Sequence, residues 1–433
     1  MKNAASLVLA LAAMPLASAA EPVTWLPSMR QTLSYSDRIG VQSHRTDLAL
    51  AAEIPLSPVT SLTLATHLEF DGRDRLEPGP VRDRNRSRLT RRHALGERGL
   101  ASLDEFYLDT QWQSWKLRLG KQQLVWGESD GFQVLDVLNP RNFREGVVED
   151  AEQARIPLWM VHAEYRLSSR NHIEWVINPD LSFHDIPDSG ALFEITSPLL
   201  APPRPPSGSG DVPIEYRRPA LAWDTLELAT RLRFGWKALE GGIVAMRRHH
   251  RTPIQTLIRD DAAPHVERSY LLTHDVGLQL SHPVGRFLLR GEALYSQRAP
   301  LPVLVVPGTD QDTQAPRHSA LIALETAMGG SGLASIQLLE IDLHAHSAQL
   351  DNPQRYVSLL VRQSWDRYRL EGEVFHAQSI RQADRLWKWR LRHRIDDQIT
   401  VIGGIDLFSG TDTGVFGQHR KLDRTMIQIK LDL

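Results

Sequence analysis

Apolar and polar side chains alternate along this chain in repeated segments of about ten residues. In one such segment, Trp159, Val161 and Tyr165 are separated by His162 and Glu164. Because successive side chains of a strand point to opposite faces, each segment is predicted to form a strand with one apolar and one polar face. A strand of about ten residues can cross a membrane when it is tilted. The pattern therefore predicts an all-β chain, as a soluble sandwich or as a transmembrane barrel.

The connections between the predicted strands favour the barrel. Short connections at 55–58 and 114 are each followed by a long one, at 71–101 and 125–156. Outer-membrane barrels show this alternation because short turns join their strands on the periplasmic side and long loops join them outside. We therefore predict a transmembrane antiparallel β-barrel of about 14 to 18 strands, with long outer loops, short periplasmic turns and both termini in the periplasm.

Four tryptophans lie at the predicted short turns, namely Trp112, Trp115, Trp236 and Trp365. Each one alone could be a core residue of a soluble protein. Barrels in the outer membrane carry girdles of aromatic residues at the membrane interfaces. Their shared position therefore predicts one such girdle at the periplasmic interface.

The N-terminus predicts export. Lys2 precedes an apolar run at 4–13, and Ala17-Ser18-Ala19 is the small-residue pattern of a cleavage site. The run is shorter than the roughly 20 apolar residues that a membrane-spanning helix needs. We expect residues 1–19 to be a signal peptide and residues 20–433 to form a barrel in the outer membrane.

Composition and motifs exclude several function classes. The chain has no cysteine and a net charge of -2, so neither thiolate chemistry nor a nucleic-acid partner is indicated. His162 and Ser182 are available for hydrolysis, but no nucleophile elbow accompanies them. No third ligand accompanies His344 and His346. We predict no catalytic residues, no metal and no cofactor.

Residues 117–145 read LRLGKQQLVWGESDGFQVLDVLNPRNFRE. This stretch resembles the proteobacterial outer-membrane family DUF1302, whose members carry a strand ending in an LRLGRQ-like run, then WGES, then an Asn-Pro pair in a loop. Here these are 117–122, 126–129 and Asn139-Pro140. The resemblance implies a barrel linked with export or uptake of hydrophobic compounds, sometimes beside RND-type transporters. Inner-membrane or periplasmic transport components are the partners that it implies.

The long connection at 125–156 combines charged residues with apolar ones such as Phe132 and Leu135. A loop that is solvated on all sides would not carry so many apolar side chains. It could therefore fold into the barrel and narrow it, or pack outside as a cap. For the inward arrangement, the candidate constriction residues are Trp126, Glu128, Asp130, Arg141 and Arg144.

Charged residues on the predicted inner faces suggest further pore positions. Glu105 and Asp109 lie on one strand, and Lys116 and Arg118 lie on the next. Opposed charges across a lumen would orient polar solutes, whereas opposed charges on neighbouring strands would pair and stabilise the wall. Both interpretations stay open for these four residues.

A second basic run comprises Lys388, Arg390 and Arg392. We expect the acidic residues near it in the sequence to be too few to neutralise it, so these side chains are also candidate pore residues. If the surplus charge faces the lumen, the pore is expected to prefer anions.

The connection at 71–101 contains seven arginines between Arg82 and Arg98. One interpretation is a flexible, solvated outer loop. The other is contact with lipopolysaccharide, because arginine binds phosphate through paired hydrogen bonds.

Together these features predict an outer-membrane channel or transporter for small solutes or hydrophobic compounds, with lipid and lipopolysaccharide around it. The alternatives are a plugged structural or receptor barrel in an export assembly and an outer-membrane hydrolase.

Overall fold

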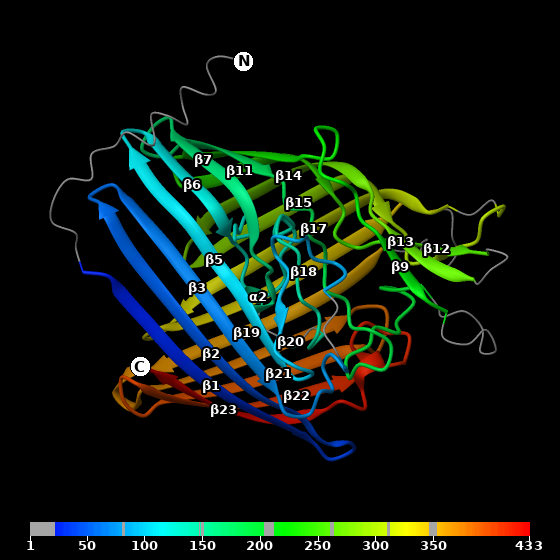
Figure 1. The fold of residues 1–433 in the computed structure, drawn as a ribbon. Helices are drawn as coiled ribbons and strands as arrows, with labels where there is room; N and C mark the ends of the chain where they lie inside the picture. Colours follow the sequence, from blue (N-terminus) through cyan, green and yellow to red (C-terminus); the bar gives the residue numbers. More distant parts are fainter. Residues whose placement is uncertain are drawn as a thin grey trace.

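A computed structural model describes residues 22–79, 83–146, 148, 151–202, 212–259, 264–309, 312–345 and 353–433. The predicted signal peptide lies outside these residues. The main sheet has 19 strands, of which the two-residue β4 (His93–Ala94) pairs only with β5. The other strands form a closed antiparallel barrel of 18 strands. Closure occurs where β1 pairs with β23, for example with Met29 opposite Leu431 (Figure 1).

The barrel strands follow one another around the ring in chain order. They are β1 (Thr24–Ser36), β2 (Gly40–Ser57), β3 (Thr60–Asp71), β5 (Gly99–Trp112), β6 (Trp115–Gln122), β7 (Leu158–Arg166), β8 (His172–Asn178), β10 (Glu227–Trp236), β11 (Leu239–His249), β14 (Leu272–Val284), β15 (Phe287–Pro300), β17 (Gln314–Met328), β18 (Gly332–Leu343), β19 (Gln354–Trp365), β20 (Leu370–Ser379), β21 (Arg385–Arg394), β22 (Ile399–Ser409) and β23 (Arg424–Asp432). Every segment predicted as a strand from its alternation overlaps one of these. The expected fold class is therefore confirmed, and the strand number equals the upper limit of the expected range.

Long and short connections lie at opposite ends of the barrel. The short turns include 113–114, 237–238 and 285–286, and the chain leaves the last strand at the same end (Figure 1). The long connections 72–98, 123–157 and 179–226 lie at the other end or inside the ring. By the rule for outer-membrane barrels, the end with the short turns is periplasmic.

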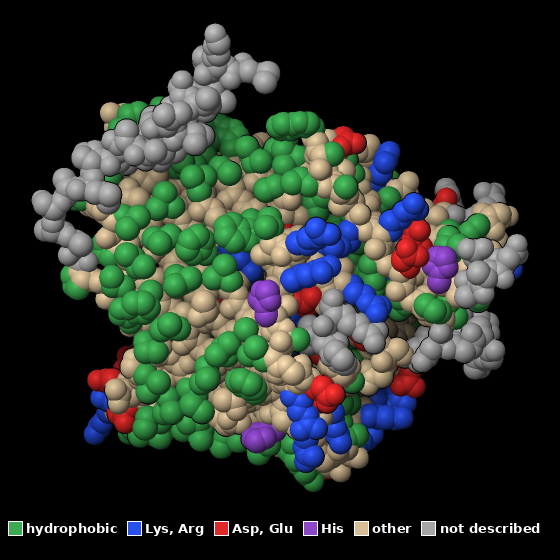
Figure 2. Space-filling view, in the orientation of Figure 1, with side chains coloured by type: hydrophobic (Ala, Val, Ile, Leu, Met, Phe, Trp, Pro, Cys, Tyr) green, Lys and Arg blue, Asp and Glu red, His purple; other side chains and the backbone are tan. Residues whose placement is uncertain are grey.

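The outer surface of the barrel is a belt of apolar side chains (Figure 2). Ile322 on β17 and Ile336 on β18 are among its exposed members. The tryptophans predicted at the short turns, Trp112, Trp115, Trp236 and Trp365, are all exposed at the periplasmic ends of their strands. Exposed apolar groups over the height of a barrel are stable in lipid and unstable in water. This belt and the closed ring place the protein in the outer membrane.

A small second sheet lies at the outer end, at the right of Figure 1. Its strands are β9 (Ile214–Arg217), β12 (Ile254–Ile258), β13 (His265–Ser269) and β16 (Leu304–Val305), in the order β16-β12-β13-β9. They come from three different outer connections, so this sheet joins those connections to one another.

Local differences from the expected strands occur at turns. The strand β20 begins only at Leu370, because the short 3-10 helix η1 (Asp366–Tyr368) is followed by Arg369 in the left-handed region, with φ 49°. The four-residue helix α2 (Ala151–Ala154) lies within the long connection before β7. Among the described residues, no helix is long and apolar enough to cross a membrane.

Candidate functional site

The connection between β6 and β7, residues 123–157, contacts inward-facing side chains from strands all around the ring, and we call it the crossing loop. One carboxylate holds its first part. The Glu292 side chain, on the inner face of β15, accepts hydrogen bonds from four backbone N–H groups of the loop, those of Glu128, Ser129, Val134 and Leu135, at 2.9, 3.2, 2.8 and 3.1 Å. A carboxylate with this many donors fixes the loop tip at the middle of the barrel.

Two further walls hold the same part of the loop. The Gln337 side chain on β18 accepts from the backbone N–H of Phe132 at 2.8 Å and donates to the carbonyl of Asp130. On β14, Gly277 leaves room for Leu135, since a Cβ at this glycine would lie 2.5 Å from a methyl carbon of Leu135. The loop tip is thus clamped between β14, β15 and β18.

Trp126 anchors the start of the loop to the opposite wall. Its side chain is fully buried, and its indole N–H donates to Glu174 on β8 at 3.2 Å. The Arg231 guanidinium on β10 lies 5.2 Å from the centre of the Trp126 ring and pairs with Glu174 at 2.8 Å. The expectation that Trp126 lines a pore is therefore wrong, because this network withdraws it from any passage.

Glu128 is a candidate of the crossing loop that remains accessible within the barrel. Its side chain is 35% exposed and accepts from Gln279 at 2.7 Å. Arg290 and Arg233, on the inner faces of β15 and β10, lie 3.4 and 4.0 Å from its carboxylate. The half-buried Asp130 follows two residues later in the same loop tip. This part of the loop therefore presents acidic groups to basic side chains of the wall.

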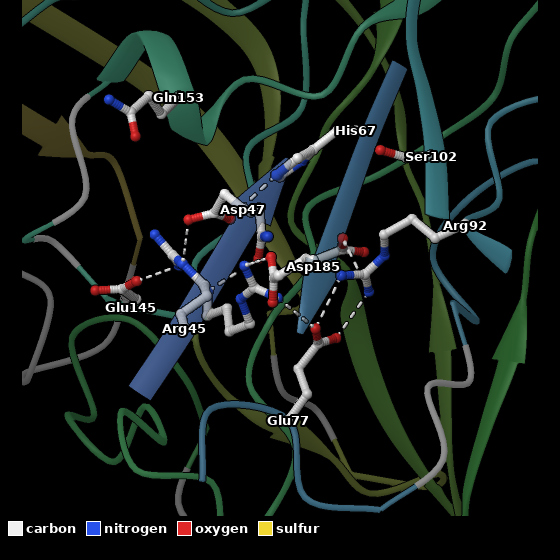
Figure 3. Close-up of polar contacts among 12 residues, drawn as sticks. Arg45, Asp47, His67, Glu77, Arg92, Ser102, Glu145, Gln153 and Asp185 are labelled. Carbon is white, nitrogen blue, oxygen red and sulfur yellow. Dashed lines mark hydrogen bonds and ion pairs between the residues drawn. The ribbon is translucent and has the colours of Figure 1, made fainter. Parts of the chain in front are cut away.

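The outer half of the crossing loop lies in a network of buried ion pairs (Figure 3). Glu145 lies between Arg45 of β2 and Arg424 of β23, at 2.5 and 2.8 Å. Burial alone would raise the pKa of Glu145, but Arg45 and Arg424 outweigh it and hold the pKa at about 2. The carboxylate is therefore charged at neutral pH and joins the loop to both sides of the closing seam.

The basic candidates of this loop also have partners. Arg144 forms a two-pronged pair with Glu69 of β3, with both distances 2.7 Å, and contacts Glu77 at 3.1 Å. Arg141 pairs with Asp136 at 2.6 Å. Arg144 is buried and structural, whereas Arg141 is half-buried and borders a cavity.

On the wall formed by β5 and β6, the predicted charges are neighbours. Arg118 and Lys116 lie 2.8 and 3.4 Å from Asp109, and the Arg118 guanidinium lies 4.4 Å from the ring centre of Tyr107. Glu105 lies on the same strand as Asp109. These contacts support the interpretation that the charges pair along one wall, and they contradict a field between Asp109 and these bases across the lumen.

The basic run on β21 is neutralised more fully than the sequence suggested. Arg390 pairs with Asp406 on β22 at 2.7 Å, and Arg392 pairs with Glu371 on β20. Lys388 is buried. The expectation that acidic residues are too few is wrong, because Asp406 and Glu371 are placed by pairing with β22 and β20. The surplus of positive charge from which the anion preference was predicted is therefore not present at Arg390 and Arg392.

The arginine-rich connection at 72–98 is not simply solvated. Arg92 pairs with Asp83 and, at 2.7 Å, with Glu77, and Arg86 lies 2.6 Å from Asp185 of the connection before β10. Burial alone would raise the pKa of Glu77, but Arg92 outweighs it and holds the pKa at about 2. A flexible, solvated loop is therefore the wrong interpretation for this part, while Arg82 lies outside the described residues.

Residues considered for hydrolysis or metal binding have separate partners. His162 lies 3.2 Å from Glu174, and the Ser182 hydroxyl donates to Asp180 at 2.6 Å. His346 lies outside the described residues. In the part of the chain that the structure describes, no three histidines, aspartates or glutamates form a group that could hold a metal ion.

Sequence reasoning missed the wall residues that hold the crossing loop, above all Glu292 and Gln337. The sequence around these two residues gave only a weak indication of their role. Each is an inward-facing polar residue between apolar ones, in the runs GEAL and SIQLL. Alternation alone gave them the polar face, and nothing in the sequence showed which loop would reach them.

The ring, the apolar belt and the loop crossing the lumen define an outer-membrane β-barrel. Among solved structures, the fold is similar to OccAB3 of Acinetobacter baumannii, at 7% identity and a TM-score of 0.54 over 95% of this chain and 99% of that one. OccAB4 of the same organism gives 10% identity and 0.51 over 95% and 98%. OccD3 (OpdP) of Pseudomonas aeruginosa gives 10% and 0.50 over 97% and 95%.

The family model for DUF1302, a protein family of unknown function, matches residues 65–403. The chain therefore belongs to DUF1302, as the motif at 117–145 indicated. No curated protein matches the sequence.

Proposed function

We propose that this protein is an outer-membrane channel for small solutes, narrowed by the crossing loop. The observation that carries the proposal is the attachment of the loop tip to Glu292 at mid-barrel, with charged side chains accessible on the periplasmic side of it. Among these, the side chains of Arg233 on β10 and Lys116 on β6 are 46% and 44% exposed. Accessible charged side chains beside a fixed loop are what a constricted pore needs.

The constriction in this proposal is formed by Glu128 and Asp130 of the loop against Arg233 and Arg290 of the wall. Charges of opposite sign on two sides of a passage orient polar solutes and select among ions. A hydrophobic cargo, which the family resemblance implies, would have to pass the same charged section.

Single-channel conductance of the refolded mature chain in a planar bilayer tests the proposal. Glu292→Ala removes the acceptor of four loop N–H groups, so we expect a higher and noisier conductance than in the wild type. Replacement of residues 128–135 by two glycines should raise it further. Glu240→Ala is the matched control, because Glu240 is an exposed glutamate near the periplasmic end of β11. Silence of all four proteins, each shown to be folded by its heat-dependent gel mobility, would overturn the proposal.

The plugged receptor barrel is the second candidate, and the buried ion pairs of the outer half favour it. The charged side chains of Arg45, Glu145 and Arg424 are all buried in the outer part of the barrel. In that case Glu292→Ala would not conduct, and inner-membrane or periplasmic partners would have to be sought by crosslinking.

We also propose lipopolysaccharide as the lipid partner of the connection at 72–98. Arg88 and Arg91 are exposed, and the indole N–H of Trp159, on the lipid-facing side of β7, donates to the carbonyl of Leu89 between them at 3.0 Å. This contact holds the loop beside the outer end of β7, where the proposal requires the phosphates of the outer leaflet.

A further inference from the structure

A cavity of about 250 Å³ lies on the outer side of the crossing loop. The loop forms one side of it, with Val134 and Arg141 among its lining residues. The inner faces of β11, β15, β17 and β18 form the other side, and His184 and His250 of two outer connections border it. A solute entering from outside would reach this cavity before the clamped loop tip.

One cation in this cavity lacks an acidic partner. The Arg317 side chain, on the inner face of β17, donates from Nε to the Ser319 hydroxyl at 3.1 Å. Among the described residues, no carboxylate lies within ion-pair distance of Arg317. The other arginines of the lining differ, since Arg248 pairs with Asp275 at 2.6 Å and Arg251 with Glu227 at 2.8 Å. The cavity therefore carries a positive charge that its walls do not neutralise.

The two histidines that border the cavity, His184 and His250, each carry a hydrogen-bond donor but no charge. Nδ1 of His184 accepts from the backbone N–H of Arg141 at 2.8 Å, and Nδ1 of His250 accepts from that of Thr252 at 3.2 Å. A backbone N–H can only donate, so each Nδ1 is unprotonated and each neutral ring carries its hydrogen on Nε2. Burial, with nearby arginines, lowers the pKa of both histidines well below 6.5, which keeps them neutral.

The remaining walls of the cavity are hydrocarbon. The apolar lining residues come from the crossing loop and from β15 and β18, and they are Val134, Val137, Phe143, Leu294, Leu339 and Ile341. The site thus combines an unneutralised guanidinium and hydrogen-bond donors with an apolar surface.

We propose that this cavity binds an organic acid, with its carboxylate on Arg317 and its hydrocarbon part on the apolar walls. An inorganic anion would leave the hydrocarbon surface unused. A neutral hydrocarbon would leave the guanidinium without a counter-charge in a partly desolvated site, which is unfavourable. Only a molecule with both parts satisfies both surfaces. The inference deepens the channel proposal and rests on it, because it names the solute class held at the outer side of the constriction.

Calorimetric titration of the full mature chain in lipid nanodiscs tests this assignment with octanoate as the probe. We expect saturable binding of octanoate. 1-Octanol should bind at least about tenfold more weakly because it cannot form a charge-assisted hydrogen bond with Arg317, and inorganic phosphate should bind at least about tenfold more weakly because it leaves the apolar walls unused. Arg317→Gln should weaken octanoate binding by a similar factor. Arg298→Gln is the matched control, because Arg298 is an exposed arginine at the outer end of β15 and does not line the cavity. It should bind octanoate as the wild type does.

Conductance of the same variants separates this inference from the channel proposal. Octanoate bound through Arg317 by a protein that does not conduct would support the site and contradict the channel. A conducting protein in which Arg317→Gln binds octanoate as tightly as the wild type would overturn the site and leave the channel standing. Equal binding of octanoate and phosphate would also overturn it, because the apolar walls would then contribute nothing.

Discussion

At the scale of single residues, the burial of ion pairs decides which charges hold the structure. The Glu145 side chain is buried and forms ion pairs with Arg45 and Arg424. Glu145→Gln would leave two buried guanidinium groups facing a neutral amide, so we expect a loss of about 3–5 kcal/mol in unfolding free energy. Urea unfolding in lipid vesicles measures it. Glu53→Gln, at an exposed glutamate of β2, is the control and should change stability by less than about 0.5 kcal/mol; an equal loss in both variants would contradict the prediction.

A second residue gives the connection between β22 and β23 a pH dependence. Burial lowers the pKa of His419, in the 3-10 helix η2 (Gly417–His419), from 6.5 to about 4. The ring lies against Phe193 and Phe408, with ring centres 5.5 and 5.7 Å away. When the connection is open, His419 binds a proton below its ordinary pKa of 6.5, whereas in the closed form it binds one only below about pH 4. The closed form is therefore fully stable above pH 6.5 and loses stability as the pH falls towards 4.

Hydrogen exchange of the amides at 410–423 measures this change. We expect faster exchange near pH 4.5 than near pH 7, after correction for the intrinsic rate, and a flatter profile in His419→Phe. Asp384 accepts a hydrogen bond from the backbone N–H of Gly417 at 2.6 Å, and burial raises the pKa of its carboxyl group. A raised carboxyl pKa makes the closed form more stable as the pH falls, which opposes the effect of His419. A pH dependence that His419→Phe retains in full would therefore assign the effect to another group.

At the scale of elements, the arginine-rich connection at 72–98 combines two roles. Its inner arginines bind acids of the protein, while Arg88 and Arg91 face outward near Arg218. Burial and the neighbouring guanidinium groups of Arg91 and Arg88 lower the pKa of Arg218. Mutual repulsion of this kind is relieved by a phosphate. We expect the double variant Arg88→Gln/Arg91→Gln to retain about tenfold less lipopolysaccharide in native mass spectrometry. Arg286→Gln, in a periplasmic turn, should retain as much as the wild type.

The strands could be predicted from the sequence because their information is local. Alternation gives each residue its face, and the lengths of the connections give the direction of each strand. The start of β20 cannot be predicted in this way, because the left-handed Arg369 ends a turn that alternation does not reveal. The crossing loop was harder, since Glu292 is 164 residues from Glu128, and only the closed ring brings them together. The ion pair between Arg390 and Asp406 could not be predicted for a similar reason, because it depends on how two adjacent strands pair and not on the sequence of one strand.

At the scale of the whole molecule, stability in lipid depends on closure of the ring between β1 and β23. Backbone N–H and C=O groups at an open sheet edge find no water in the hydrocarbon core, and each unsatisfied group costs several kcal/mol. Removal of residues 424–433 would expose such edges on β1 and β22. We expect this variant not to insert into vesicles, measured by extraction with urea and by the loss of heat-dependent mobility on a gel.

A deletion of similar length elsewhere is the control for this prediction, because the outer sheet makes no part of the ring. Removal of residues 255–268 takes away most of β12 and β13 but no barrel strand. This variant should insert and migrate as a folded barrel, with its stability lowered only at the outer end. If both deletions fail to insert, the outer sheet is needed for assembly and the closing seam is not the deciding element. If both insert, the ring tolerates an open edge in lipid, contrary to the argument from unsatisfied backbone groups.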